Sequence, residues 1–221
     1  MKQVSSEDNF IFLLVALLTL LFTVAVVEQF FQGGQLLVVS AIILCLAFSI
    51  LGVKRQAIYT KSWFGVLLTL FLVTYVISIL TNLNLSLLTI ALVIVFLMHY
   101  MISAFKQVLF TGQVGSNQII GSICIYLMIG LVWSFVYLFL LESFNGGFSG
   151  LENQHWLDNL SSVIYYSFIT LTTVGYGEIT PTLPITRFFA YMQSLTGSFY
   201  LAILVASLVS TGLEQRKRKV N

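Results

Sequence analysis

The residues best suited to chemistry in this chain are five in a row, Thr173-Val174-Gly175-Tyr176-Gly177. Glycine adopts backbone angles that other residues avoid, so two glycines that alternate with larger residues let successive carbonyl groups point to the same side. A row of carbonyl oxygens replaces the water around a dehydrated monovalent cation, and the Thr173 hydroxyl adds one more oxygen at the end of the row. We therefore expect a cation to bind along residues 173–176, with the side chains of Val174 and Tyr176 pointing away and packing behind the row.

Such a row needs a short helix in front of it. An apolar stretch at 160–173 precedes the glycines, but a helix that crosses a membrane needs about 20 residues. Backbone that is not helical is tolerated at membrane depth only when it is buried in protein or lines a water-filled path. We therefore predict a re-entrant helix over 160–173, capped by Asp158 or Ser161, that stops where the extended stretch 173–177 begins.

The composition indicates a membrane protein. Of the 221 residues, 58% are hydrophobic and only 8% are charged, whereas soluble domains carry roughly 25% charged residues. An all-α integral membrane protein is therefore expected. The sequence contains neither the spacing of metal ligands nor a catalytic constellation, so we expect no enzyme, no cofactor and no nucleic-acid partner.

Six apolar segments are long enough to cross a membrane. Their approximate bounds are 9–31, 35–53, 62–81, 85–105, 117–141 and 185–212. If six spans alternate, one side receives Lys2, Lys54, Arg55, Lys61, Lys106, Arg216, Lys217, Arg218 and Lys219. The other side receives Glu28, Glu142, Glu152, Asp158 and Glu178. Because basic loops stay inside, both termini are predicted to be cytoplasmic, in a multi-pass protein of the cell membrane with 142–184 facing outward.

A single copy of the glycine stretch cannot enclose an ion. A closed ring takes four copies around one axis, and the chain contains one, so the sequence predicts a homotetramer. Each re-entrant helix would direct its C-terminal end toward that axis, and such an end carries about half a negative charge. Four of these ends favour a cation in a central cavity.

These features resemble the potassium channel superfamily, in particular prokaryotic-type channels with six transmembrane helices. The resemblance covers about residues 117–212 and rests on the run Thr-Thr-Val-Gly-Tyr-Gly-Glu at 172–178, followed by Pro181. It implies a pore domain at 113–214, made of an outer helix, a pore helix at 160–173, a selectivity filter at 173–177 and an inner helix at 185–212. The permeant ion would then be K⁺.

The sequence departs from the family pattern around the filter. Glu178 stands where aspartate is usual, Tyr165 and Tyr166 stand where many members have two tryptophans, and Ile169 stands where some bacterial members have a buried glutamate. We expect Tyr165, Tyr166 and Glu178 to support the filter, and we hypothesise a hydrogen bond from the Tyr165 hydroxyl to Glu178. Arg187, near the start of the last span, either forms an outer salt bridge to a carboxylate such as Asp158 or Glu178, or snorkels.

The first four spans, in a region at 1–112, lack the charges of a voltage sensor. Sensing takes several gating charges per subunit, yet the fourth span, 85–105, contains no Arg or Lys and has only Lys106 at its inner end. We therefore predict gating that is nearly independent of voltage. His99 in this span is either an intramembrane proton site or a neutral histidine bonded to a Ser or Tyr neighbour. His155 in the outer loop is interpreted as solvated.

The inner helix is expected to line a cavity and to contain a gate. One helix face presents Ser198, Leu201, Val205 and Val209, which match cavity-lining positions of the family. Gly197 matches the family's gating hinge, and its alternative role is close helix packing. The basic cytoplasmic tail at 215–221 either binds anionic lipid through Arg216, Lys217, Arg218 and Lys219 or only obeys the inside rule.

The sequence thus predicts a homotetrameric, potassium-selective and largely voltage-independent channel. A weakly selective monovalent cation channel on the same scaffold is one alternative, although polar residues replace Tyr176 in relatives that lose selectivity. A subunit of a potassium uptake transporter is another, but such relatives carry four degenerate filters in one long chain. A non-conducting membrane scaffold is a third.

Overall fold

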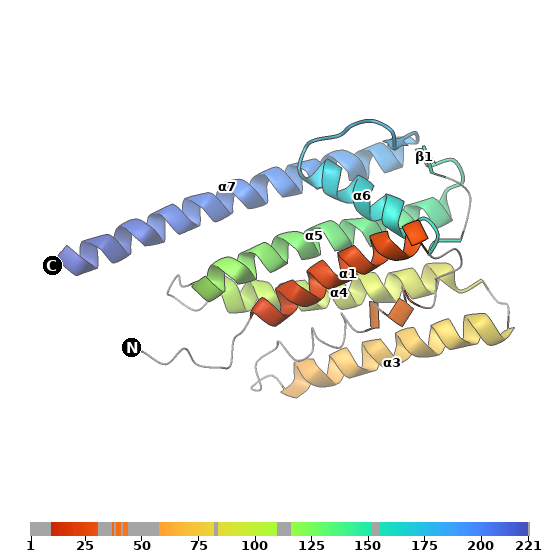
Figure 1. The fold of residues 1–221 in the computed structure, drawn as a ribbon, viewed down its shortest axis with the longest axis horizontal. Helices are drawn as coiled ribbons and strands as arrows, with labels where there is room; N and C mark the ends of the chain where they lie inside the picture. Colours follow the sequence, from red (N-terminus) through yellow and green to blue (C-terminus); the bar gives the residue numbers. More distant parts are fainter. Residues whose placement is uncertain are drawn as a thin grey trace.

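The protein is described from a computed structural model, which covers residues 10–30, 58–81, 84–109, 116–151 and 155–220 together with 37, 39–40 and 42–43. The chain is mostly helical, which confirms the all-α prediction (Figure 1). The helices are α1 (Phe10–Phe30), α3 (Ile58–Thr81), α4 (Ser86–Leu109), α5 (Ser116–Ser143), α6 (Leu160–Leu171) and α7 (Pro184–Val220). Two short strands complete the fold, β1 (Phe148–Ser149) and β2 (Thr180–Pro181).

Three of the described helices are long and apolar enough to cross a membrane. They are Phe10–Phe30, Ser86–Val108 and Asn117–Ser143. The predicted second span, 35–53, lies almost wholly outside the described residues. The count of six spans therefore stays a prediction.

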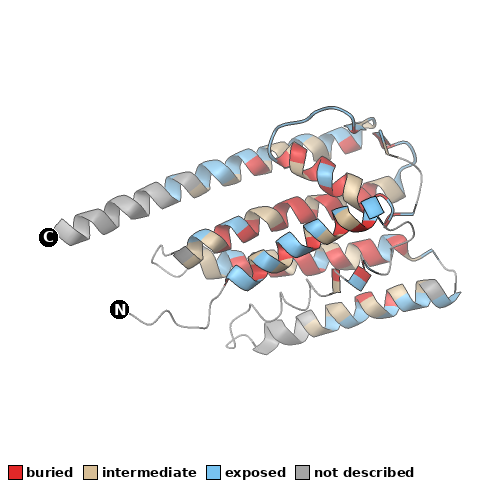
Figure 2. Ribbon diagram, in the orientation of Figure 1, coloured by how far each residue is buried: buried red, intermediate tan, exposed pale blue. Residues whose placement is uncertain are grey.

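Helix α5 occupies the centre of the arrangement (Figure 1). Helices α1 and α4 pack along one side of it, α6 and α7 pack on the other, and α3 lies beyond α4. Buried residues gather on α5 and on the faces that its neighbours turn toward it (Figure 2). Burial of apolar side chains on both sides of α5 is what places α6 and α7 next to each other.

Helix α6 begins at Leu160, as predicted, but it ends at Leu171, two residues before the predicted end, and its cap is a different residue. Its N-cap residue is Asn159, with no side-chain capping hydrogen bond, and the Asn159 carbonyl accepts the N–H of Val163 at 2.9 Å. Asp158 comes one residue too early, in a turn where its N–H donates to the His155 carbonyl at 2.9 Å. Ser161 already lies inside the helix, so both predicted caps are wrong.

The strands tie the loop after α5 to the segment after residue 177. They pair antiparallel, with Phe148 opposite Pro181 and Ser149 opposite Thr180. Gly150 follows at φ +84°, and a Cβ there would lie 2.1 Å from the Glu178 carbonyl oxygen. Only glycine allows this backbone approach, which anchors the end of the glycine stretch to the outer loop.

Candidate functional site

The C-terminal end of α6 holds the start of the glycine stretch through backbone hydrogen bonds. The carbonyl of Ile169 accepts the N–H groups of Val174 and Gly175 at 2.8 and 3.2 Å, and the carbonyl of Thr170 accepts that of Thr173 at 3.1 Å. The last carbonyls of a helix have no partner within the helix. These carbonyls therefore draw the N–H groups of the stretch back toward α6.

The backbone of the stretch alternates in hand. The φ angles of Thr173, Gly175 and Gly177 are 62°, 53° and 97°, and neither intervening residue has a positive φ. Glycine takes such angles without cost, whereas a non-glycine residue held there costs on the order of 1–2 kcal/mol. Three hydrogen bonds keep Thr173 at this positive φ. Its own N–H donates to the Thr170 carbonyl, and the N–H groups of Val174 and Gly175 donate to the Ile169 carbonyl. This is the alternation that the spacing of the two glycines predicts.

The carbonyl groups of the stretch are available to a ligand. Among the described residues, no protein group donates a hydrogen bond to a carbonyl oxygen of 173–177, and residues 172–178 are all exposed in the single chain. Carbonyl oxygens are strong acceptors that rarely stay unpaired when buried. Chemically, the stretch can offer several backbone oxygens to a cation once its surroundings exclude water.

The two larger side chains of the stretch do not pack behind it within one chain. Val174 is 52% exposed and Tyr176 is 74% exposed, so the expectation that both are covered is wrong for a single copy. The physical reason is that α6 contacts the stretch from one side only. The described residues of one chain therefore leave both side chains uncovered.

Tyr165 lies beside the stretch, and Tyr166 does not. The Glu178 carboxylate is a hydrogen-bond partner of the Tyr165 hydroxyl, and this bond raises the pKa of Tyr165 to about 12 because the hydroxyl can donate it only while protonated. Tyr166 is buried on another face of α6, with its ring centre 4.9 Å from that of Tyr137 and 5.7 Å from that of Phe148. It therefore supports α6 and not the stretch itself.

Sequence reasoning missed a buried polar cluster behind α6. Ser167, Gln193 and Tyr137 are all fully buried. The Gln193 amide nitrogen donates to the Ser167 carbonyl and hydroxyl oxygens at 2.9 and 2.7 Å, and its oxygen accepts the Tyr137 hydroxyl at 2.5 Å. The Ser167 hydroxyl donates to the Gly130 carbonyl at 2.7 Å. A glutamine inside an apolar helix was the available signal, since polar residues at membrane depth are costly.

Gly197 packs directly against the end of α6. A Cβ at this position would lie 2.3 Å from the Leu171 carbonyl oxygen, so close helix packing, one of its two expected roles, is present. The hinge role stays a prediction. Ser198 and Leu201 are exposed in the single chain. The side chains of Val205, Val209 and 216–219 lie outside the described residues.

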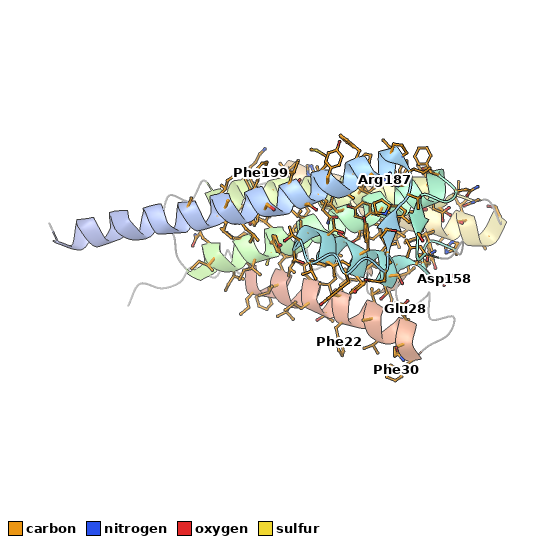
Figure 3. The ribbon with its side chains drawn as sticks, turned by 90° about the horizontal axis from the view of Figure 1, so that it is seen from above. Phe22, Glu28, Phe30, Asp158, Arg187 and Phe199 are labelled. Carbon is orange, nitrogen blue, oxygen red and sulfur yellow. The ribbon has the colours of Figure 1, made fainter. Side chains whose placement is uncertain are left out.

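Arg187 forms a hydrogen bond and not a salt bridge. Its Nε donates to the Pro181 carbonyl at 3.3 Å, and among the described residues no carboxylate lies within ion-pair distance of it. Figure 3 shows Arg187 near the N-terminal end of α7, with Asp158 on a separate segment. Among the described residues the structure shows no salt bridge from Arg187 to Asp158 or Glu178, and the bond to Pro181 braces the turn between β2 and α7.

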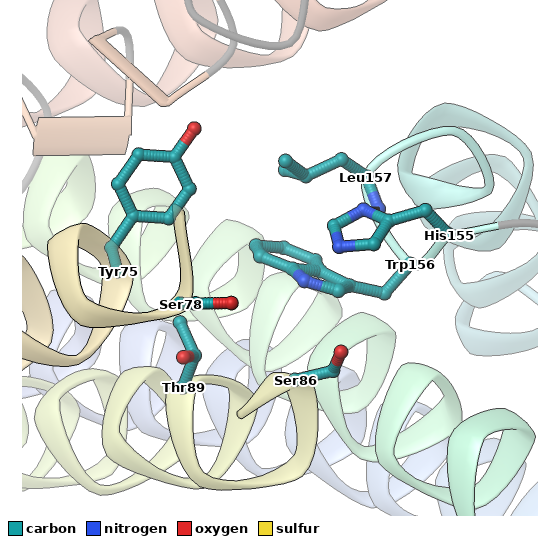
Figure 4. Close-up of a pocket in the computed structure, with 7 residues that line it drawn as sticks. All are labelled: Tyr75, Ser78, Ser86, Thr89, His155, Trp156 and Leu157. Carbon is teal, nitrogen blue, oxygen red and sulfur yellow. Dashed lines mark hydrogen bonds between the residues drawn. The ribbon is translucent and has the colours of Figure 1, made fainter. Parts of the chain in front are cut away.

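A cavity of about 200 Å³ lies away from the stretch, between the ends of α3 and α4 and the loop before α6 (Figure 4). The lining residues are Tyr75, Ser78, Ser86, Thr89, His155, Trp156 and Leu157. His155 is exposed, as expected, and its Nδ1 accepts the Leu157 N–H at 3.4 Å. Among the described residues, the polar side chains of this cavity are hydroxyl groups and the rings of His155 and Trp156. His99 is half-buried on α4, and both of its interpretations stay predictions.

Comparisons with known proteins match the C-terminal part of the chain, which carries this site. Residues 122–214 match the ion channel family Ion_trans_2. Two-pore potassium channel 5 of Arabidopsis thaliana is 31% identical over 105 residues, which are 47% of this chain and 23% of that protein. Two-pore potassium channel 3 of the same plant is 32% identical over 68 residues, covering 29% of this chain and 16% of that protein. Two pore potassium channel c of Oryza sativa subsp. japonica is 34% identical over 55 residues, covering 25% of this chain and 12% of that protein.

These similarities support the potassium channel superfamily. The matches span less than a quarter of the length of these curated relatives. No solved structure matches the chain. The family match together with the apolar helices indicates a membrane protein that contains a region similar to ion channels.

Proposed function

We propose that the chain is the subunit of a homotetrameric, potassium-selective channel that conducts K⁺ down its gradient. One observation carries the proposal: a row of available carbonyl groups, with left-handed backbone at Thr173, Gly175 and Gly177, follows a helix too short to cross a membrane. That row lies within the residues that match the ion channel family. The channels to which the chain is similar are potassium channels by name.

In this proposal the carbonyl oxygens of residues 173–176 take the place of the hydration shell of K⁺. The hydrogen bonds from Val174 and Gly175 to Ile169 hold the back of the row, so that its oxygens stay directed toward the axis. The Thr173 hydroxyl supplies the innermost oxygen. Binding shared among several sites lets an ion enter and also leave, as conduction requires.

Four copies would supply the cover that one chain lacks. Besides Val174 and Tyr176, helix α7 exposes apolar side chains three or four residues apart, namely Phe188, Tyr191, Leu195, Phe199 and Ile203. Large apolar surfaces of this kind mark sites of contact with protein or lipid. Assembly around a four-fold axis places this face of α7 between copies and brings four stretches together.

The remaining parts of the proposal concern the membrane. Six spans would place both termini in the cytoplasm, with the cation entering from the outer side past Glu178. The region 1–112 would pack around the pore without sensing voltage, and the gate would lie along α7 at Gly197, Ser198, Leu201, Val205 and Val209. Arg216, Lys217, Arg218 and Lys219 would face the inner headgroups, where each basic residue gains about 1 kcal/mol from anionic lipid.

The test is a purified full-length protein in a planar bilayer under opposed K⁺ and Na⁺ gradients. We expect a reversal potential near the equilibrium potential of K⁺, and a shift toward that of Na⁺ in Tyr176→Asp. A reversal potential midway between the two would replace the proposal with the weakly selective cation channel. Absence of both current and ion flux would replace the proposal with the non-conducting membrane scaffold.

A further inference from the structure

The polar cluster behind α6 lies where it can control the shape of the filter. Ser167 stands two residues before Ile169, whose carbonyl holds the N–H groups of Val174 and Gly175. Any shift of Ser167 along or around the axis of α6 therefore moves the point to which the filter is attached.

Helix α7 holds α6 through two consecutive residues. Gln193 donates to the Ser167 carbonyl at 2.9 Å, and Ser194 donates to the Thr170 carbonyl at 3.3 Å. The two carbonyls lie about one turn apart on α6. Contacts at two heights restrain both the height and the tilt of α6, whereas a single contact would leave the tilt free.

Helix α5 contacts both α6 and α7 and completes the restraint. The Tyr137 hydroxyl donates to the oxygen of the Gln193 amide, and the Gly130 carbonyl accepts the Ser167 hydroxyl. The Gln193 amide thus contacts two neighbours: its nitrogen donates to Ser167, and its oxygen accepts from Tyr137. A buried network that is fully satisfied in this way is rigid and specifies one arrangement.

We propose that Gln193 is a positioning residue for ion selection: its amide ties α5 to α6 and thereby sets the height and tilt at which the carbonyls of the filter face the ion. This inference rests on the proposed function, because selection is a property of a conducting pore. Gln193 itself does not contact the ion.

The test compares Gln193→Leu with a matched control, Tyr200→Phe. Tyr200 donates to the Ser122 carbonyl at 2.7 Å and so joins α7 to α5 without contacting α6. Each variant removes hydrogen bonding between the same two helices. We expect Gln193→Leu to lower the K⁺/Na⁺ permeability ratio by roughly tenfold, and we expect Tyr200→Phe to leave the ratio within about twofold of the wild type.

A double variant separates positioning from the simple cost of an unpaired hydroxyl. Gln193→Leu leaves the Tyr137 hydroxyl without its acceptor, and replacing both partners by apolar groups removes that cost. In Gln193→Leu with Tyr137→Phe we expect thermal stability to recover while the permeability ratio stays low. Recovery of both would show a structural role only and would overturn the proposal, as would an unchanged ratio in Gln193→Leu.

Amide hydrogen exchange supplies a reading that does not depend on conduction. Exchange at Val174 and Gly175 in the assembled protein should quicken by roughly tenfold in Gln193→Leu and stay near the wild-type rate in Tyr200→Phe. If the wild type proves not to select K⁺, the proposed function fails, and this measurement still decides whether Gln193 positions the stretch. Equal exchange rates in the two variants would overturn the inference.

Discussion

Helix α5 meets its neighbours through two faces that are held in different ways. Toward α1 and α4 the contact combines close apolar packing with hydrogen bonds to the first residue of α1. A Cβ on Gly121 would lie 2.7 and 3.0 Å from side-chain atoms of Val108 and Phe10. The Phe10 N–H donates to Asn117 Oδ1 at 3.1 Å, and the Cys124 thiol donates to the Phe10 carbonyl at 3.5 Å. Toward α6 and α7 the contact includes directed hydrogen bonds, from Ser167 to Gly130 and from Tyr137 to Gln193. Apolar contacts tolerate small sliding movements, whereas hydrogen bonds fix one register.

The difference shows where the molecule needs accuracy. Helices α1 and α4 have only to stay beside α5 in the membrane, and apolar packing is enough for that. In the proposed channel, helices α6 and α7 have to hold a row of backbone oxygens in one position relative to the ion. The buried network that joins the side chains of Tyr137, Ser167 and Gln193 lies on the side of α5 that packs against α6 and α7.

The largest effect is expected from Gly177→Ala. Its φ of 97° is accessible to glycine alone without strain, so alanine should turn the carbonyl row and reduce selective K⁺ flux by roughly a hundredfold, equivalent to about 3 kcal/mol. Flux into vesicles that contain equal amounts of protein measures this. Gly65→Ala on α3 is the control, since nothing lies within 4 Å of its added Cβ. Similar losses in both variants would contradict a special role for the stretch.

A smaller effect is expected from Gly197→Ala. Its Cβ would meet the Leu171 backbone at 2.3 Å, and backbone cannot move aside as a side chain can, so α7 should separate from α6 at a cost of about 1–3 kcal/mol. Gly121→Ala on the other face of α5 meets only side chains and should keep its K⁺ selectivity. Thermal unfolding in detergent and the K⁺/Na⁺ permeability ratio are the two measurements. A larger change of selectivity in Gly121→Ala would reverse the comparison between the faces.

Tyr165→Phe should have a modest effect that is confined to the filter. The variant removes the hydroxyl partner of Glu178, so the outer end of the stretch should be held less firmly. We expect faster loss of current at low external K⁺, recorded in the bilayer, with no change in thermal stability. Tyr75→Phe on α3 is the matched control. Unchanged inactivation and ion occupancy in Tyr165→Phe would refute the supporting role of this contact.

The smallest expected effect is that of membrane voltage on conductance. Within the described part of α4 the basic side chains are His99 and Lys106, and each gating charge is worth about 2.3 kcal/mol per 100 mV. Normalised conductance should therefore change little between about −100 and about +100 mV. A steep sigmoidal curve would give the α1–α4 side of α5 a directed role that its apolar packing does not indicate.

Much of the site follows from local sequence. The position of the glycine stretch and the presence of a short helix before it come from residues that are neighbours in the chain. Backbone angles at Gly175 and Gly177 depend on the absence of a side chain, which can be read without knowing the fold. The boundaries were less accurate: α6 ends at Leu171 and is capped by Asn159, because turn geometry and not residue type alone decides where a helix begins.

The rest depends on contacts between distant residues. Ser167 and Gln193 are 26 positions apart, and Tyr137 and Gln193 are 56 apart, so no local pattern shows that they meet. Tyr165 contacts Glu178, whereas Tyr166 packs against Tyr137 and Phe148. This difference depends on the position of α6 between α5 and the stretch, so the sequence does not show it.

The sequence by itself thus determined where the backbone takes a positive φ at Gly175 and Gly177, because a glycine keeps its conformational freedom in any fold. The tertiary structure alone decided what holds that backbone in place. Hydrogen bonds act over about 3 Å, so the partners of the filter became known only when packing brought α5, α6 and α7 together.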